Sequence, residues 1–194
     1  MKSEYIVYGV FILFFLLLMG ATFIVPFMAF DQDMDSAYTA FAYTCHQKLS
    51  RSHCLFKDDQ NFWIADCTIQ DGSFVNTKQD RTTIMVQDGD AIGYKIPICS
   101  RDVGIYGALL IGGIAYPFVR KLDERHIYPA IYLILALIPL GLDGSVQLLS
   151  EIGILPFLYE STNLIRLFTG VVAGFVSSFY AIPVLMNMFG GIKK

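Results

Sequence analysis

Long runs of uninterrupted hydrophobic residues dominate the chain and predict membrane-spanning helices. The first run, Tyr5 to Phe30, carries no charge. Crossing a hydrocarbon core of about 30 Å takes about 20 helical residues, so this run is long enough to span. Three further runs follow at Val103–Val119, Ile127–Leu142 and Leu164–Phe189. The hydrophobic stretch of a secretory signal is usually only about 7–15 residues, so we interpret the first run as a retained helix.

The predicted fold class is an all-α membrane protein, a four-transmembrane-helix bundle with a small, partly β extracytoplasmic insert. The first helix occupies residues 1–30, and an extracytoplasmic segment covers 31–102. The remaining elements are helices over 103–119, 127–147 and 163–189, and a tail over 190–194. Glycines are dense in the second helix, which favours the close approach of a neighbouring helix.

The basic residues predict the orientation in the membrane. They concentrate at three chain positions, namely Lys2, the group Arg120, Lys121 and Arg125, and the pair Lys193 and Lys194. Because cytoplasmic connections are enriched in Lys and Arg, both termini and the connection around residue 121 are expected in the cytoplasm. The segment 31–102 and the connection 150–163 are then expected outside the cell membrane.

The extracytoplasmic segment is too long for a plain connection and should have structure of its own. Residues 36–49 carry aromatics among small residues and predict a helix at the membrane surface. Residues 55–98 contain β-branched and aromatic runs interrupted by Gln87–Asp90, which is typical turn chemistry. We therefore expect a small β-hairpin unit in this part.

Composition agrees with a membrane protein and limits the partners. Hydrophobic residues make up 55% of the 194 residues and charged residues only 16%, against about a quarter in soluble domains. The net charge is −3 and there is no dense basic run, so nucleic acid is not expected as a partner. The expected partner is the lipid bilayer.

All four cysteines lie in the extracytoplasmic segment, where disulfides are the default expectation. We favour a bond between Cys54 and Cys67, because they bracket the start of the β insert. Cys45 and Cys99 could form a second disulfide, hold a metal ion, or remain free thiols. Cys99 also precedes a predicted helix N-terminus, which would lower its pKa.

Polar residues gather near the predicted outer ends of the helices. They are Cys45, His46 and Gln47, then Cys99 and Asp102, then Asp143 and Gln147, and finally Ser161, Asn163 and Arg166. Asp143 and Gln147 are one helical turn apart and share a face. Since four helix ends meet one membrane face, we expect these groups in a single layer.

These motifs resemble those of a domain-of-unknown-function family of prokaryotic membrane proteins. The family is marked by Cys-His-Gln, Pro-Xaa-Cys-Xaa-Arg-Cys-Xaa-Gly, Asp-Gly-Xaa-Xaa-Gln and Ser-Thr-Asn-Xaa-Xaa-Arg. The corresponding segments here are Cys45–Gln47, Pro97–Gly104, Asp143–Gln147 and Ser161–Arg166. The resemblance implies membership but no established activity. The family pattern has a second cysteine where this chain has Asp102, and the insert from Leu55 to Lys95 is longer than the family needs.

The substitution at Asp102 discriminates between mechanisms. A carboxylate in place of one sulfur would abolish thiol–disulfide exchange at that pair. It would still serve a metal, because zinc accepts thiolate, imidazole or carboxylate ligands. Zinc or another divalent metal held by Cys45, His46, Cys99 and Asp102 is therefore one hypothesis. A second site built from Cys45-His46 and His53-Cys54 is a further, less favoured alternative.

The leading functional hypothesis is a membrane-embedded, metal-dependent hydrolase or transferase acting on a lipid or lipid-linked substrate. Asp143 would serve as general base or further ligand, and Arg166 would bind an anionic head group. Gln147 and Asn163 would orient the substrate, with Ser161 beside them.

Structural roles remain open for the same residues. Asp143 and Arg166 could form an interhelical ion pair, since charges near a membrane need partners. Ser161 or Asn163 could cap the fourth helix. The alternative function is a non-catalytic accessory or assembly subunit that docks another membrane protein through the extracytoplasmic insert.

Overall fold

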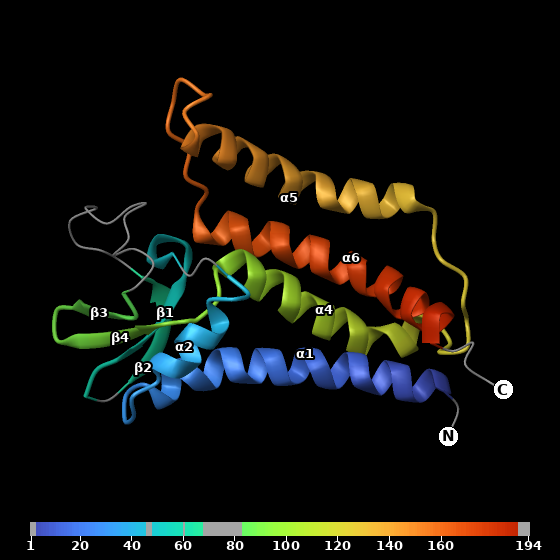
Figure 1. Cartoon of the computed structure of the whole chain (residues 1–194), viewed down its shortest axis with the longest axis horizontal. Coiled ribbons are helices and arrows are strands. Elements are labelled where there is room, and N and C mark those ends of the chain that lie inside the picture. The colour runs from blue at the N-terminus through green and yellow to red at the C-terminus, as the bar shows by residue number, and fades with distance from the viewer. Residues whose placement is uncertain (1–2, 46–47, 60, 68–82, 190–194) are drawn as a thin grey trace. The chain divides into compact units, whose positions relative to one another are not determined.

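The computed structural model describes residues 3–45, 48–59, 61–67 and 83–189 (Figure 1). The chain forms two compact units. The helical unit combines Met1–Met19 with Val103–Lys194, and the sheet unit is Gly20–Asp102.

Four helices within the described ranges are long and apolar enough to cross a membrane. They are α1 (Ser3–Met28), α4 (Ser100–Val119), α5 (Ala130–Glu151) and α6 (Asn163–Phe189). Their existence confirms the four long apolar helices expected from the hydrophobic runs. Helix α5 extends to Glu151, one turn beyond the expected end at residue 147, and continues through Pro139 without interruption.

Glycines bring α4 and α6 to backbone contact in the helical unit. A Cβ atom added at Gly104 would lie 2.4 Å from the carbonyl oxygen of Leu167. One added at Gly174 would lie 2.2 Å from the carbonyl oxygen of Ile105. Because real Cβ atoms do not approach so closely, only glycine fits these positions. Small residues at helix contacts are the usual device for close packing in membranes.

Helix α4 also packs against the first part of α1, so it lies between α1 and α6 (Figure 1). The Tyr8 hydroxyl on α1 donates a hydrogen bond to the Gly113 carbonyl at 3.1 Å. Phe11, Tyr116, Ile182 and Met186 form a buried apolar cluster from the three helices. Helix α5 packs on α6 and exposes many large apolar side chains, as expected of a helix surrounded by lipid.

The sheet unit is built around a four-stranded antiparallel sheet in the order β2-β1-β4-β3. The strands are β1 (His53–Lys57), β2 (Phe62–Asp66), β3 (Met85–Asp88) and β4 (Ala91–Lys95). A two-residue turn at Gly89, which has a φ of 59°, joins β3 to β4. That conformation favours glycine and agrees with the expected turn chemistry.

A disulfide joins Cys54 and Cys67, as predicted from the sequence. It links β1 to the residue that follows β2. Both cysteines are buried with Leu49, Phe56 and Ala91 in a small apolar core. The bond therefore fastens one edge of the sheet around a core that is too small to be very stable alone.

Two features of the sheet unit differ from the sequence interpretation. The surface helix expected over 36–49 is the shorter α2 (Asp35–Phe41), followed by turns and a 3₁₀ turn at Leu49–Arg51. The Thr44 hydroxyl donates to the Phe41 carbonyl at 2.8 Å, which competes with continuation of the helix. Strand β1 was not predicted, although Cys54 and Phe56 alternate as buried residues along it.

Candidate functional site

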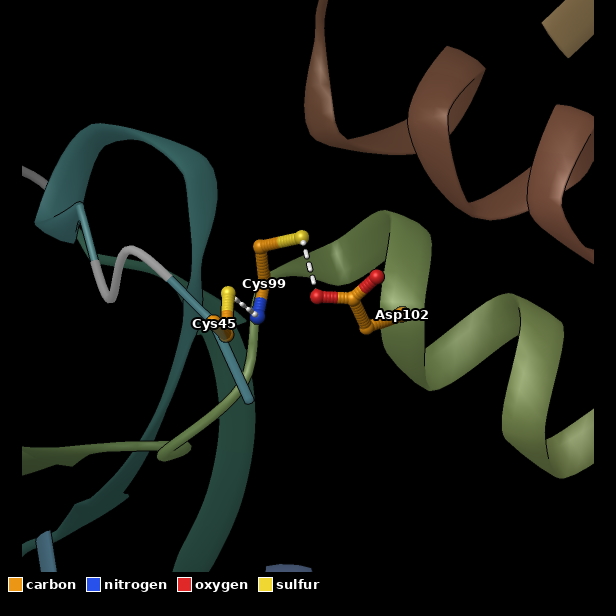
Figure 2. A group of neighbouring side chains, drawn as sticks. All are labelled: Cys45, Cys99 and Asp102. Carbon is orange, nitrogen blue, oxygen red and sulfur yellow. Dashed lines mark hydrogen bonds between the residues drawn. The ribbon is translucent and has the colours of Figure 1, made fainter. Parts of the chain in front are cut away.

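Cys45, Cys99 and Asp102 form a thiol–carboxylate cluster in the sheet unit. One ligand atom from each residue lies within 4.8 Å of the others. Figure 2 shows the Cys45 sulfur beside the backbone nitrogen of Cys99 and the Cys99 sulfur turned toward the Asp102 carboxylate. The Cys99 N–H donates to Cys45 Sγ at 3.3 Å, and the Cys99 thiol donates to Asp102 Oδ2 at 3.1 Å. Both cysteines are free thiols and half-buried.

Local structure explains why these residues meet. After β4, the buried residues Pro97 and Ile98 lead the chain to the start of α4 at Ser100. Cys99 therefore precedes the helix and Asp102 lies in its first turn, three residues later, where the two side chains can face each other. Cys45 enters from the end of the α2 segment, where its N–H donates to the Phe41 carbonyl at 3.2 Å.

The electrostatic environment of Cys99 differs from the expectation. The pKa of this thiol is raised rather than lowered. The largest cause is its hydrogen bond with the Cys45 thiol, and burial and the nearby Asp102 carboxylate add to it. These effects favour the neutral thiol over the thiolate, and they outweigh the helix N-terminus. Without a metal, Cys99 is therefore a protonated thiol at neutral pH.

The donor set fits a zinc-class ion. Thiolate–zinc and carboxylate–zinc distances of about 2.3 and 2.0 Å place tetrahedral ligand atoms about 3.3–3.8 Å apart. The Cys99 sulfur and the Asp102 oxygen are 3.1 Å apart, and the three possible ligand atoms lie within 4.8 Å of one another, which is close to this spacing. Two sulfurs and one carboxylate are ligands that zinc accepts.

His46 and His53 are the two histidines considered as metal ligands from the sequence. His46 lies outside the described residues. His53 places Nδ1 2.9 Å from the Ser100 hydroxyl and Nε2 3.3 Å from Asp66 Oδ1. The Ser100 hydroxyl also lies 3.1 Å from the Arg51 carbonyl oxygen, so the donor in the first contact depends on the tautomer of His53. The alternative site that used His53 and Cys54 is wrong, because Cys54 is disulfide-bonded to Cys67.

A second polar group, the carboxylate–arginine network, lies at one end of α5 and α6 in the helical unit. Arg166 is almost fully buried and forms an ion pair with Glu160 at 2.8 Å. Asp143 Oδ1 accepts a hydrogen bond from the Tyr159 hydroxyl at 2.9 Å. That bond is the largest cause of the raised pKa of Tyr159. Arg166 and Asp143 thus both have polar partners, as charged groups near a membrane need.

The remaining predicted residues of α5 and α6 join the same network. Gln147 Nε2 lies 3.4 Å from Glu160 Oε1, and Asn163 Oδ1 accepts from Arg166 Nη1 at 3.4 Å. Ser161 is buried beside them. The residue that caps α6 is neither Ser161 nor Asn163 but Thr162, whose hydroxyl accepts the Ile165 N–H at 3.3 Å.

Sequence reasoning missed Tyr159 and Glu160. Both lie in the connection between α5 and α6, directly before Ser161. The useful signal was Arg166 itself, because an arginine in an apolar helix needs a carboxylate partner and Glu160 is only six residues away. The thiol–carboxylate cluster and the network belong to different units, so the single polar layer expected from the sequence stays a prediction.

The four apolar helices define an integral membrane protein. The family model described as "Predicted membrane protein (DUF2085)" matches residues 90–180. A relative named "Uncharacterized protein MJ1492", from Methanocaldococcus jannaschii, is 36% identical over 133 residues, covering 68% of this chain and 78% of the relative. The chain belongs to this DUF2085 family of predicted membrane proteins.

A second family model, the FHA domain, matches residues 32–93. The described part of that segment contains α2, strands β1 to β3 and the first three residues of β4. No solved structure matches the chain.

Proposed function

We propose that this membrane protein binds one zinc-class ion through Cys45, Cys99 and Asp102 and uses it for hydrolysis or group transfer on a lipid or lipid-linked substrate. The observation that supports the proposal is the convergence of two free thiols and one carboxylate from two chain segments, with Cys45 on one and Cys99 and Asp102 on the other. Cys54 and Cys67 in the same unit do form a disulfide, so the thiol state of Cys45 and Cys99 distinguishes this pair from the other. Free thiols kept together beside a carboxylate are typical of a metal site.

Three protein ligands suit catalysis better than a purely structural role. Structural zinc sites use four protein ligands, whereas catalytic sites keep one position for water or substrate. A bound ion would supply a Lewis acid and a water molecule acidified to a pKa of about 7. Cys45, Cys99 and Asp102 would hold the ion, and His46 is a further candidate ligand.

The network in the helical unit supports the lipid part of the proposal. Asp143 would act as a general base, and Arg166 would bind an anionic head group. Gln147, Asn163 and Ser161 would orient that group. Glu160 is partly exposed, so a phosphate could replace it beside Arg166. The test is Asp143→Asn: lost turnover with retained metal supports this role, and retained turnover removes Asp143 from the mechanism.

We also propose that both termini face the cytoplasm and that the sheet unit is extracytoplasmic. Arg120, Lys121 and Arg125 at the α4–α5 connection support this orientation. Alkaline phosphatase fused after Asp123 should be inactive in the cytoplasm, and a fusion after Leu158 should be active. The reverse pattern would invert the topology.

The first experiment measures metal content and free thiols on protein purified in detergent without chelator. We expect about one ion per chain, as in a mononuclear site. The ion should be lost in Cys99→Ser and Asp102→Ala. It should be kept in Asp66→Asn, a matched control whose carboxylate contacts His53 outside the cluster.

Two results would overturn the metal proposal. Protein without metal and without free thiols would show a Cys45–Cys99 disulfide, which would make this pair a structural staple. Protein without metal but with two free thiols, even after incubation with zinc, would show that the cluster does not bind the ion.

A second candidate function is an accessory subunit that docks through the sheet unit. The observation that favours it is the edge strand β2, where Phe62, Trp63 and Ile64 are all exposed. Exposed apolar edge strands are common docking templates. Ile64→Lys should then abolish co-purification of a specific membrane partner and leave metal content unchanged, with Ile92→Lys as a control on the inner strand β4.

A further inference from the structure

The connection between α5 and α6 exposes a group of large apolar side chains. Their exposed fractions are 59% for Ile152, 64% for Ile154, 54% for Phe157 and 95% for Leu158. Soluble loops usually carry polar residues at such positions, and a contiguous apolar group marks an interaction surface. We call these four residues the apolar connector.

The connector is held in shape by hydrogen bonds to the end of α5. The Ser150 hydroxyl donates to the Phe157 carbonyl at 3.1 Å and accepts from the Tyr159 N–H at 2.7 Å. The N–H of Ile154 donates to the Leu149 carbonyl at 3.0 Å. Gly153 has a φ of 76°, which permits the sharp reversal after the helix. The apolar side chains are therefore presented by an ordered backbone.

The connector continues the lipid-facing surface of the two helices. Leu148 on α5 and Leu164 and Phe168 on α6 are also largely exposed. Residues 152–159 carry no charge, and the exposed carboxylates of Glu151 and Glu160 flank them at the two ends of the connector. Burying charge-free apolar surface in a bilayer is favourable, and the satisfied backbone groups lower its cost.

We propose that the apolar connector inserts into the membrane leaflet at this end of α5 and α6, with Leu158 and Phe157 among the acyl chains. The occupant of the surface is lipid, because the surface is continuous with that of two membrane-spanning helices. Tyr159 and Glu160 follow the connector directly, so insertion holds the carboxylate–arginine network at the level of the head groups. Insertion of the apolar connector into lipid requires neither the metal ion nor any reaction.

The test uses tryptophan as a depth probe. The chain has one tryptophan, Trp63, so Trp63→Phe gives a silent background. Leu158→Trp is then compared with Leu142→Trp, exposed near the middle of α5, and Asp123→Trp, in the charged α4–α5 connection. Each variant is reconstituted in phosphatidylcholine vesicles with bromine at a shallow or deep acyl position, and iodide is the aqueous quencher.

We expect Leu158→Trp to be quenched most by shallow bromine and to be several-fold less sensitive to iodide than Asp123→Trp. Leu142→Trp should be quenched most by deep bromine. Iodide quenching equal to that of Asp123→Trp would place the connector in water and overturn the inference. Protection from both iodide and bromine would show a protein covering the surface, a second copy included, and would overturn it equally.

A second variant guards against misfolding caused by tryptophan. Leu158→Asp changes a side chain that contacts almost nothing in the protein, so the fold should persist in detergent. In vesicles the aspartate should shift a reporter at Phe157→Trp toward water, seen as a red-shifted emission and greater iodide quenching. Unchanged emission would show that the connector was never inserted.

Discussion

The thiol–carboxylate cluster and the carboxylate–arginine network differ in how their polar groups are partnered. In the network, the buried Arg166 already has the carboxylate of Glu160, and Asp143 has the hydroxyl of Tyr159. In the cluster, two thiols and a carboxylate face one another with weak thiol hydrogen bonds and no basic group among the three. The charged groups Arg166 and Asp143 of the network therefore already have partners, and the cluster is improved by a cation.

The difference leads to a general distinction. A polar group that is fully paired in an apolar region contributes to a unique structure, and breaking one pair is costly. Metal-ligand side chains that hold their protons tightly and contact one another weakly contribute little to stability, so replacing one of them costs little. Replacing one does change which ions the protein can bind. Stability measurements should thus respond to changes in the network, and metal measurements should respond to changes in the cluster.

The largest stability effect is expected where α4 and α6 touch beneath the network. Gly174→Ala would place a methyl group 2.2 Å from the Ile105 carbonyl oxygen, which is backbone and cannot rotate away. Overpacking of this kind should cost about 3 kcal/mol. Thermal unfolding in detergent measures it, and Gly141→Ala on α5, where nothing lies within 4 Å, is the matched control. Equal melting temperatures for the two variants would contradict the backbone contact.

The next effect comes from the ion pair. Glu160→Gln leaves Arg166 buried without its carboxylate and should cost roughly 2 kcal/mol, less than the 3–5 kcal/mol of a fully buried pair because Glu160 is partly exposed. Glu151→Gln is the control, since Glu151 is exposed and accepts a hydrogen bond from Gln147 at 3.3 Å. If the control were as destabilising as Glu160→Gln, the Arg166 pair would not be the important contact.

A smaller effect is expected at Asp143. Tyr159→Phe removes the hydroxyl that donates to this carboxylate at 2.9 Å and should cost about 1 kcal/mol. Denaturant titration in mixed micelles measures the free energy, with Tyr132→Phe, exposed on α5, as the control. A stability equal to that of the unaltered protein would show that Asp143 finds an equivalent donor without Tyr159.

Much of the fold could be predicted because its signals are local. Uncharged runs such as Tyr5–Phe30 show the helices, since a bilayer tolerates few exposed charges. The Cys54–Cys67 bond followed from the expected oxidising compartment and from the position of the two cysteines, which bracket the start of the β insert. The extent of α2 was overestimated, because the Thr44 side chain competes with the helix at a position where propensity alone gives no stop.

The partners in the two polar sites could not be predicted in the same way. Glu160 reaches Arg166 because Ser150 ties the connection back to α5, a contact of tertiary structure. The raised pKa of Cys99 depends on Cys45, which is 54 residues away in the sequence. The expectation from the helix N-terminus, that the pKa of Cys99 would be lowered, was therefore wrong. The short spacing of Cys99 and Asp102 was enough to predict them as ligands. The protonation of Cys99 depends on a contact that is distant in sequence and could not be predicted.

Substitution of Asp102 is expected to have the smallest effect on the stability of the metal-free protein and a large effect on its stabilisation by zinc. In metal-free protein, Asp102→Asn should change the free energy of unfolding by less than about 0.5 kcal/mol, because the carboxylate is half-exposed and accepts from the weak thiol donor of Cys99. Zinc at about 100 times its dissociation constant should stabilise the unaltered protein by about 2.7 kcal/mol.

The same zinc concentration should stabilise Asp102→Asn far less, because the amide is a poorer ligand than the carboxylate. Asp123→Asn, in the α4–α5 connection, is the control and should respond to zinc as the unaltered protein does. Thermal unfolding with and without zinc measures all three proteins. If Asp102→Asn were as destabilising without metal as Glu160→Gln, the cluster would be a structural network of the same kind, and its contrast with the Arg166 network would be lost.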